Sequence, residues 1–366
     1  MDYQIAVAGP DDRQRVMDFL NEVYPEGAPQ RDPERWDYTY GAGRYRLWFA
    51  HDQTGRVFGQ LGAMDATCTV RGEVVEMAWI LNVIVSPAAR GKGIASALVR
   101  AIEERHSVCG GTGANDNSVG LLAALGWDLL PEVPRHVRIL RPGYYVSRAL
   151  ARHSPRPSAH DMSIATRYRP PLGGRQQAGA EVVVRPVSRF DDAVKQLHER
   201  IRHRYDFIGD RTPDELNYRI LAHPVIRAAA LEAVKGADLM GLIAFAGICR
   251  DGERIGLILD WLFDPTDAEV GRALLRRAGA TLQAAGAHRI EAWFQPPAMR
   301  ELLTQDGFRR WPGAIRGTAN AALSARLGDP ARSIVVTPAD SNLHEEFLLV
   351  GFAEAREYGF LELGLR

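Results

Sequence analysis

One eleven-residue segment constrains this chain more than any other: residues 83–93 read VIVSPAARGKG. The apolar pattern of residues 79–85 predicts a strand, and a helical pattern over residues 96–105 follows the glycines at once. Glycines in a tight loop let main-chain N–H groups turn inward at a helix N-terminus, where the unpaired amides and the helix dipole favour a phosphate. Arg90 and Lys92 add positive charge. The segment therefore predicts a pyrophosphate-binding loop between a strand and a helix.

Two other kinds of phosphate loop do not fit these residues. A P-loop needs Gly-Lys followed by Ser or Thr, whereas Lys92 is followed by Gly93. The dinucleotide-binding fingerprint needs a glycine or alanine at its sixth position, where this chain has Ser96. A glycine turn that only caps a helix is the remaining alternative. The agreement of strand, proline, loop and helix favours a coenzyme over that plain cap.

The order Arg-x-x-Gly-x-Ala in this loop resembles the coenzyme A loop of the GNAT acetyltransferase superfamily, whose motif reads Gln/Arg-x-x-Gly-x-Gly/Ala. The resemblance implies acetyl-CoA, or another acyl-CoA, as co-substrate and no metal. It also implies that the preceding strand offers backbone groups to the pantetheine arm and that Asn115 lies near the pantetheine amides. Asn115 is also a good N-cap for the following helix. The coenzyme-binding residues expected on this basis are Val83, Ile84, Val85, Arg90, Gly91, Lys92, Gly93, Ile94, Ala95 and Asn115.

The catalytic residues are less clear, because the chain departs from the family pattern at one position. Many GNAT proteins carry a tyrosine that protonates the leaving thiolate, and the matching position here is Leu122. A thiol with a pKa near 8.5 is only modestly basic, so the thiolate can leave without a dedicated acid. Ser118, Tyr144 or Tyr145 is the alternative acid, with Ser118 the first choice. Glu76, on the predicted long strand, is the first candidate for the base that deprotonates the amine, ahead of Asp65 and His51.

Composition places the chain among globular proteins and gives no sign of a polyanionic partner. Its 366 residues suit two domains, and it carries 45 basic and 45 acidic side chains, so nucleic acid is not an expected partner. The three cysteines, Cys68, Cys109 and Cys249, are far apart and show no metal-ligand spacing. We expect each to be a small buried hydrophobe. No signal peptide and no membrane-spanning run is recognised, which predicts a cytoplasmic protein without a membrane partner.

The order of predicted elements indicates a tandem repeat of one α/β (α+β) unit. We expect a coenzyme-binding catalytic domain over residues 1–149, closed by a strand at 135–140, and a linker or strap over residues 150–180. Residues 181–366 start the pattern again as a degenerate domain without the glycine loop, because Asp267 and Glu269 stand in its place. The fold class expected is two tandem GNAT-like domains, each with a mixed central sheet flanked by helices.

The function expected from the resemblance is transfer of an acyl group from acyl-CoA to a primary amine of a small polar acceptor, for example an amino sugar. The second domain is expected to shape the acceptor site through residues 198–219, with Asp340 and Ser341 as possible additions. Two alternatives stay open. One is a coenzyme A-binding sensor or scaffold without catalysis. The other is an acetyltransferase that acts on a protein lysine or N-terminus.

Overall fold

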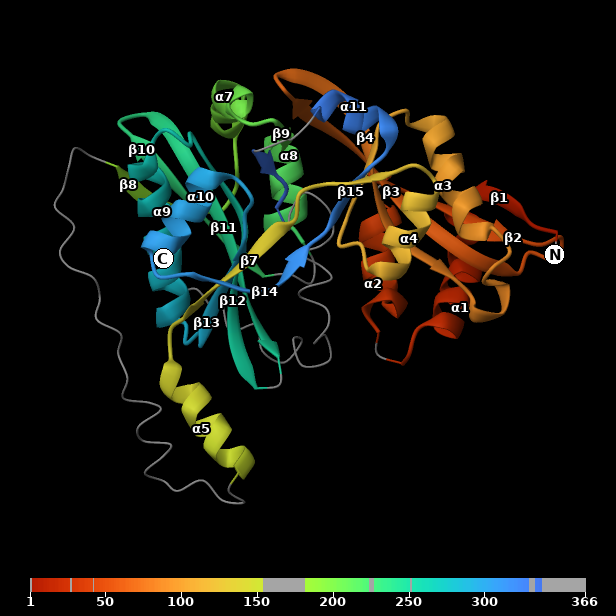
Figure 1. Cartoon of the computed structure of the whole chain (residues 1–366), viewed down its shortest axis with the longest axis horizontal. Coiled ribbons are helices and arrows are strands. Elements are labelled where there is room, and N and C mark those ends of the chain that lie inside the picture. Colours follow the sequence, from red (N-terminus) through yellow and green to blue (C-terminus); the bar gives the residue numbers. More distant parts are fainter. Residues whose placement is uncertain are drawn as a thin grey trace.

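The computed structural model describes residues 2–26, 28–41, 43–153, 182–223, 227–250, 252–328 and 333–337. Two mixed sheets lie side by side, each with its own helices (Figure 1). Within these ranges no helix is both long and apolar enough to span a bilayer. Most of the expected linker, and the residues Asp340 and Ser341, lie outside the described residues.

The first half alternates strands and helices as the sequence pattern predicts, with boundaries that differ by a few residues. Its elements are β1 (Gln4–Val7), α1 (Arg13–Val23), α2 (Pro33–Trp36), β2 (Tyr45–His51), β3 (Val57–Val70), β4 (Glu73–Val85), α3 (Ile94–Arg105), β5 (Cys109–Thr112), α4 (Asp116–Ala124), β6 (Asp128–Leu129), β7 (Val133–Ile139) and α5 (Pro142–His153). A π-helical turn, Asp37–Gly41, follows α2 directly. Helix α5 was not expected, and it occupies the first residues of the predicted linker.

The second half repeats this order. Its elements are β8 (Val183–Val187), α7 (Asp192–Ile201), β9 (Phe207–Gly209), α8 (Pro213–Leu216), β10 (Ala228–Lys235), β11 (Asp238–Arg250), β12 (Glu253–Phe263), α9 (Ala268–Ala284), β13 (Arg289–Trp293), α10 (Pro297–Gln305), β14 (Arg309–Ile315), β15 (Gly317–Ala319), α11 (Ala321–Leu327) and β16 (Ile334–Val335). A second π-helical turn, Asn217–Leu221, follows α8.

The two halves exchange one strand each, which corrects a sequence expectation. The strand expected at 135–140 forms as β7, but it lies between β13 and β14 in the sheet of the second half. The corresponding place in the first sheet, between β5 and β6, is taken by β15 from the C-terminal part of the chain. Figure 1 shows β7 running from the first half into the second, and the α11–β15 segment lying against the first half. Neither sheet is therefore built from one half alone.

Further contacts join the halves. Strand β9 pairs with the C-terminal end of β3, Cys68–Val70, and β16 pairs with β9. The rings of Tyr38 and Tyr218 stack with centroids 4.5 Å apart. The two tyrosines hold equivalent positions, because each lies five residues after the proline that begins α2 or α8. Each hydroxyl donates a hydrogen bond to the main-chain carbonyl of the other residue. This reciprocal contact is what a pseudo-twofold relation between the repeats predicts.

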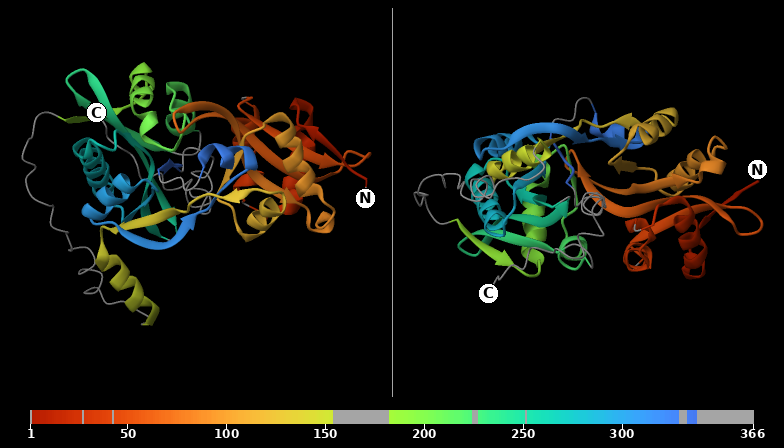
Figure 2. Two further views of the ribbon diagram at one scale, coloured as in Figure 1. Left: turned by 45° about the horizontal axis from the view of Figure 1, so that its top comes forward. Right: turned by 90° about the horizontal axis from the view of Figure 1, so that it is seen from below.

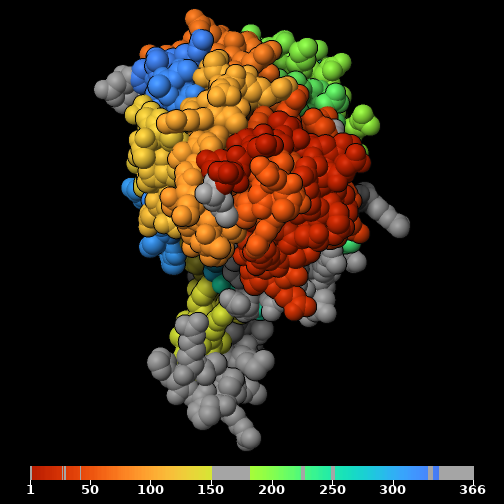
Figure 3. Space-filling view, turned by 90° about the vertical axis from the view of Figure 1, so that its right-hand side faces the viewer, coloured from red at the N-terminus to blue at the C-terminus, as the bar shows by residue number. Residues whose placement is uncertain are grey.

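Alternation along the strands divides the core into layers. In β2, Leu47 and Phe49 pack with α1 and α2, whereas Trp48 and Ala50 pack with α3 on the opposite face of the sheet. A third and larger cluster joins the inner end of the first sheet to the whole second sheet. The two further views of Figure 2 show the helices on the faces of the two sheets. In Figure 3 the blue atoms of the C-terminal part lie directly beside the orange and yellow atoms of the first half.

Candidate active site

The glycine loop has the geometry expected of an anion site. Gly91 and Gly93 have φ values of 75° and 76°, in the left-handed region that glycine adopts without steric cost. Gly93 is the N-cap of α3 and brings no capping side chain, so the first amides of this twelve-residue helix face outward unsatisfied. Arg90 and Lys92 are exposed beside them. These residues can hold two adjacent phosphates by main-chain amides and positive charge.

A β-bulge interrupts β4 a few residues before the loop. Gln60 pairs with Ile84 and Gly62 pairs with Leu81, so Asn82 and Val83 together face the single residue Leu61. Asn82 has a φ of 53°, a left-handed conformation that asparagine tolerates better than most residues. The bulge takes the main-chain groups of Asn82 and Val83 out of the β3–β4 ladder. Bulges of this kind re-aim the backbone next to active sites.

The first sheet opens between β4 and β5 at the level of the bulge. Strands β4 and β5 pair in parallel from Ala78 and Cys109 to Ile80 and Gly111, and beyond this point they separate. The gap is a cleft of about 200 Å³. It is lined by β4, by the end of β5, by α3 and α4, and by one residue of β15; these include Leu81, Asn82, Val83, Val99, Thr112, Asn115, Ser118, Leu122 and Thr318. Since β15 belongs to the C-terminal part, both halves build this cleft.

Three residues predicted from the sequence meet on the α4 side of the cleft. Asn115 caps α4, and its Oδ1 accepts hydrogen bonds from Ser118 N at 3.0 Å and from Ser118 Oγ at 2.9 Å. The proton of Ser118 Oγ is thus directed to Asn115 rather than into the cleft. Leu122 lines the cleft and is buried. Of the three strand residues expected to meet pantetheine, only Val83 lines the cleft, whereas Ile84 and Val85 pair with β3.

The candidate bases are not brought to this cleft. Glu76 is exposed on β4, six residues before Asn82, which is about 20 Å along a strand. Asp65 faces Arg46 and His106, each at 3.4 Å. The Nδ1 of His51 lies 2.8 Å from the main-chain oxygen of Asp52. Among the described lining residues of the cleft there is no carboxylate and no histidine.

The two tyrosines considered as acids also lie elsewhere. Tyr144 stacks on His288 with ring centroids 3.8 Å apart. Tyr145 donates a hydrogen bond to Glu253, and burial together with that carboxylate raises the pKa of its phenol. Both anchor α5 to the second sheet. Burial raises the pKa of the Cys109 thiol to about 12, and Cys68 is buried as well, which confirms the expectation that these two cysteines are small core residues.

The equivalent region of the second half is closed by its own side chains. A bulge near Asp260 matches the one near Asn82, but Asp260 is fully buried in an ion pair with Arg211, Nε to Oδ2 at 2.7 Å. Tyr205 donates a hydrogen bond to the main-chain oxygen of Phe263 at 2.9 Å. Asp267 caps α9 by accepting from Val270 N at 3.3 Å. The loss of the glycine loop in the second copy is therefore accompanied by a filled site.

The segment 198–219 was expected to bind the acceptor. Many of its side chains instead fill the closed region of the second half or lie in the interface between the two halves. Arg211 and Tyr205 are buried in the second half, and Tyr218 stacks on Tyr38. Arg44 pairs with Glu215 at 2.7 Å across the joint. The acceptor-binding prediction for this segment therefore receives no geometric support from these residues.

Several cleft residues were missed by sequence reasoning. Asn82 carried a recognisable signal, since an asparagine inside the apolar run 79–85 is out of pattern. Tyr24 and Gln30, which also line the cleft, follow α1 in a segment rich in proline and glycine. Thr318 carried no signal, because its place depends on the strand exchange.

Comparison with known proteins agrees with this geometry. Residues 4–107 match the family model of the acetyltransferase (GNAT) domain. A GCN5-related N-acetyltransferase from Anabaena variabilis has a similar structure, with a TM-score of 0.60 and 15% identity over 87% of this chain and 72% of its own. A GCN5-related N-acetyltransferase from Kribbella flavida has a TM-score of 0.56 and 18% identity over 87% of this chain and 70% of its own. No curated protein matches the chain.

A further similar structure is N-myristoyltransferase from Saccharomyces cerevisiae with bound myristoyl-CoA. It has a TM-score of 0.55 and 14% identity over 87% of this chain and 82% of its own. At these identities the structural similarity establishes the fold. The match to the family model adds evidence from the sequence of residues 4–107. The first half of the chain therefore contains a sequence that matches the GNAT domain, and the chain as a whole has the fold of two GNAT-like domains in tandem.

Proposed function

We propose that the chain transfers an acyl group from an acyl-CoA, with acetyl-CoA as the first candidate, to a primary amine of a small polar acceptor. One observation carries this proposal: the uncapped N-terminus of α3, the bulge at Asn82 and the opening between β4 and β5 are arranged in sequence along one strand and one helix. Such a path offers amides to a pyrophosphate at one end and room for a thioester at the other. The filled site in the second half supports assigning the coenzyme to the first half.

The reaction proposed is direct transfer. The neutral amine nitrogen attacks the thioester carbonyl carbon, the C–N bond forms and the C–S bond breaks. The products are an amide and free coenzyme A, and the proton that the nitrogen loses is balanced by the proton that the thiolate gains. Main-chain groups of the bulge, outside the β3–β4 ladder, are placed to stabilise the negative charge on the carbonyl oxygen.

Deprotonation of the amine is assigned to solvent. No carboxylate or histidine is found among the described lining residues of the cleft, and Glu76 lies far from it. The value of kcat/KM is therefore expected to rise with pH up to the pKa of the acceptor amine itself. The variant Glu76→Gln is expected to keep the wild-type rate within about twofold, since a distant surface carboxylate contributes little. A large loss of kcat in this variant contradicts the solvent assignment.

The proposal is tested by following free thiol with acetyl-CoA, propionyl-CoA and myristoyl-CoA against a panel of amines. Myristoyl-CoA is included because a structure of similar fold holds it. Coenzyme binding is measured separately by calorimetry. Thiol release that depends on both amine and coenzyme supports the proposal, whereas failure to bind any acyl-CoA overturns it.

Leu122 favours a second candidate function. It lines the cleft where a tyrosine stands in many GNAT proteins, and it cannot donate a proton. A protein that binds coenzyme A as a sensor or scaffold has no need of that phenol. Tight binding of acetyl-CoA without turnover of any amine, peptide lysines included, favours this second function. Turnover of a lysine peptide alone favours a protein acyltransferase.

A further inference from the structure

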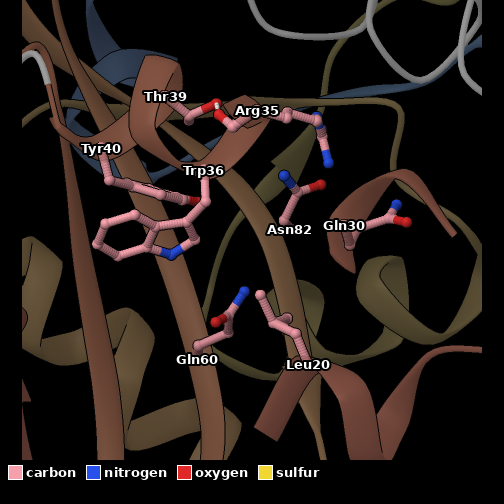
Figure 4. A pocket seen from close by; sticks show the side chains of 8 residues that line it. All are labelled: Leu20, Gln30, Arg35, Trp36, Thr39, Tyr40, Gln60 and Asn82. Atoms are coloured by element: carbon pink, nitrogen blue, oxygen red, sulfur yellow. Dashed lines mark hydrogen bonds between the residues drawn. The ribbon is translucent and has the colours of Figure 1, made fainter. Parts of the chain in front are cut away.

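Two carboxamide side chains, those of Gln30 and Asn82, stand between the cleft and a second, much smaller cavity. The second cavity is lined by residues of α1, α2, β3 and the bulge, among them Leu20, Trp36 and Gln60 (Figure 4). Its enclosed space of about 20 Å³ is enough for about one water molecule, so it holds no substrate. Gln30 and Asn82 line the cleft as well. Their amides are therefore placed to meet a ligand on the cleft side.

The cleft passes through the first sheet from one face to the other. Val99 and Leu122 line it on the face that α3 and α4 cover, and Tyr24 and Gln30 line it on the face that α1 and α2 cover. The glycine loop begins α3, so a coenzyme held there enters from the α3–α4 face. The α1–α2 face is then left for the amine. Gln30 and Asn82 lie where an amine from that face meets the thioester.

The backbone of Asn82 is held in a conformation that glycine adopts more easily. Its φ is 53°, and the other non-glycine residue with a positive φ in the described part of the chain is Arg71, at 48°. Arg71 lies in the turn between β3 and β4, where a left-handed residue closes the hairpin. Asn82 lies instead in the bulge at the cleft. Strain that is kept at a cleft, where glycine removes it, points to a use for the side chain.

Neither carboxamide is engaged by the rest of the described structure. The side chains of Gln30 and Asn82 are partly buried and make no hydrogen bond with another described residue. Asn115 in the same cleft differs, because its amide oxygen accepts from Ser118. Figure 4 shows the Gln30 and Asn82 amides side by side at the open space. Two such amide oxygens can accept the two N–H groups of a neutral primary amine.

We propose that Asn82 and Gln30 bind the acceptor amine and aim it at the thioester. Each amide oxygen accepts one N–H, which leaves the nitrogen lone pair free to face the carbonyl carbon. The inference rests on the proposed acyl transfer. As the C–N bond forms and the C–S bond breaks, the nitrogen gives one proton to solvent and the thiolate takes one. A carboxamide takes no proton itself, so this role agrees with deprotonation by solvent.

The variant Asn82→Gly removes the amide and keeps the backbone conformation without strain. The value of kcat/KM for the amine is expected to fall about fivefold or more, as for the loss of one hydrogen bond, and the Kd for acetyl-CoA to stay within about twofold. The matched control Arg71→Gly changes the same kind of φ in the hairpin turn and is expected to leave both values unchanged. If Asn82 only shapes the bulge, Asn82→Gly keeps wild-type kinetics, and that result overturns the proposal.

Two further variants test the contact with the amine. Gln30→Met keeps the length of the side chain without its amide and is expected to lower kcat/KM about fivefold, whereas Gln53→Met, in an exposed turn, is expected to change nothing. Asn82→Asp places a carboxylate beside the nitrogen and is expected to lower KM for the amine below its pKa, since a carboxylate attracts the ammonium form. A KM equal to that of wild type in Asn82→Asp contradicts the contact.

Two unreactive coenzyme derivatives test the contact without turnover. Carbamoylmethyl-coenzyme A (CoA–S–CH₂–CO–NH₂) carries an N–H group close to the place of the attacking nitrogen, and acetonyl-coenzyme A (CoA–S–CH₂–CO–CH₃) carries a methyl group there. By calorimetry, wild type is expected to bind the carbamoylmethyl derivative about fivefold more tightly, and Asn82→Gly to abolish the difference. Equal Kd values in wild type overturn the amine contact and leave the coenzyme site standing. Failure to bind either derivative or coenzyme A itself counts against the proposed function instead.

Discussion

The substitution Gly93→Asp tests the coenzyme loop most directly. Gly93 is exposed at the N-terminus of α3, and the nearest neighbour of an added Cβ is the Tyr3 hydroxyl at 3.8 Å. A side chain therefore fits, and the left-handed φ of 76° costs about 1 kcal/mol for aspartate. We expect the fold to survive with a slightly lower Tm.

The effect on coenzyme binding is much larger than the effect on stability. A carboxylate about 5 Å from each of two phosphate charges opposes them by about 1–3 kcal/mol per charge, for an effective dielectric constant between 80 and 20. The sum of about 2–6 kcal/mol raises the Kd for acetyl-CoA at least about 30-fold. The isosteric variant Gly93→Asn carries the same backbone strain without the charge, and is expected to bind several times more weakly than wild type.

Calorimetry with acetyl-CoA at low and high salt measures these terms. The ratio of Kd values between the aspartate and asparagine variants is expected to shrink as salt rises, because exposed charges are screened. Ala268→Asp places the same charge at the start of α9, beside the capping residue Asp267, and is expected to leave binding unchanged. If Gly93→Asp binds acetyl-CoA as wild type does, or Ala268→Asp weakens binding equally, the coenzyme loop has been assigned wrongly.

Three further predictions concern stability and folding. Arg211→Met removes the ion partner of the buried Asp260 and is expected to lower the free energy of unfolding in urea by about 3–5 kcal/mol. Adding Asp260→Leu is expected to recover most of this loss. A double variant whose loss equals the sum of the two single losses contradicts this prediction. Burial, aided by the charge of Arg141, lowers the pKa of His288 to about 4, so the unfolded chain binds a proton between pH 6.5 and 4 that the folded chain does not. Stability is therefore expected to fall as pH is lowered through that window, and His288→Asn to flatten the fall in Tm; an unchanged slope counts against it. A fragment of residues 1–149 lacks β15 and is expected to show no cooperative thermal transition; a sharp transition with coenzyme binding refutes the need for the exchanged strand.

Local features were predictable from the sequence because they depend on neighbouring residues. The strand ending at Val85, the glycine loop and the helix after it follow from apolar period, proline and glycine within some twenty residues. The N-cap at Asn115 and the repeated order of elements in the second half were predictable for the same reason.

Long-range pairing was not predictable in this way. The pattern of residues 133–139 predicts a strand but does not indicate which sheet it joins. Its placement depends on partners more than a hundred residues away, such as Glu291 on β13, which forms an ion pair with Arg135. Glu76 was chosen because it shares a strand with the loop. The rise along that strand nevertheless places Glu76 about 20 Å from the bulge.

The exchange of β7 and β15 also bears on how the polypeptide is made. During synthesis the first sheet lacks the strand between β5 and β6 until residue 319 has left the ribosome. The nascent N-terminal portion thus carries two unpaired strand edges while residues 130–319 are being translated, a state that favours wrong pairing. Emergence of β15 closes those edges and places Thr318 in the cleft in one step. Completion of the cleft is thereby delayed until β15 has been translated.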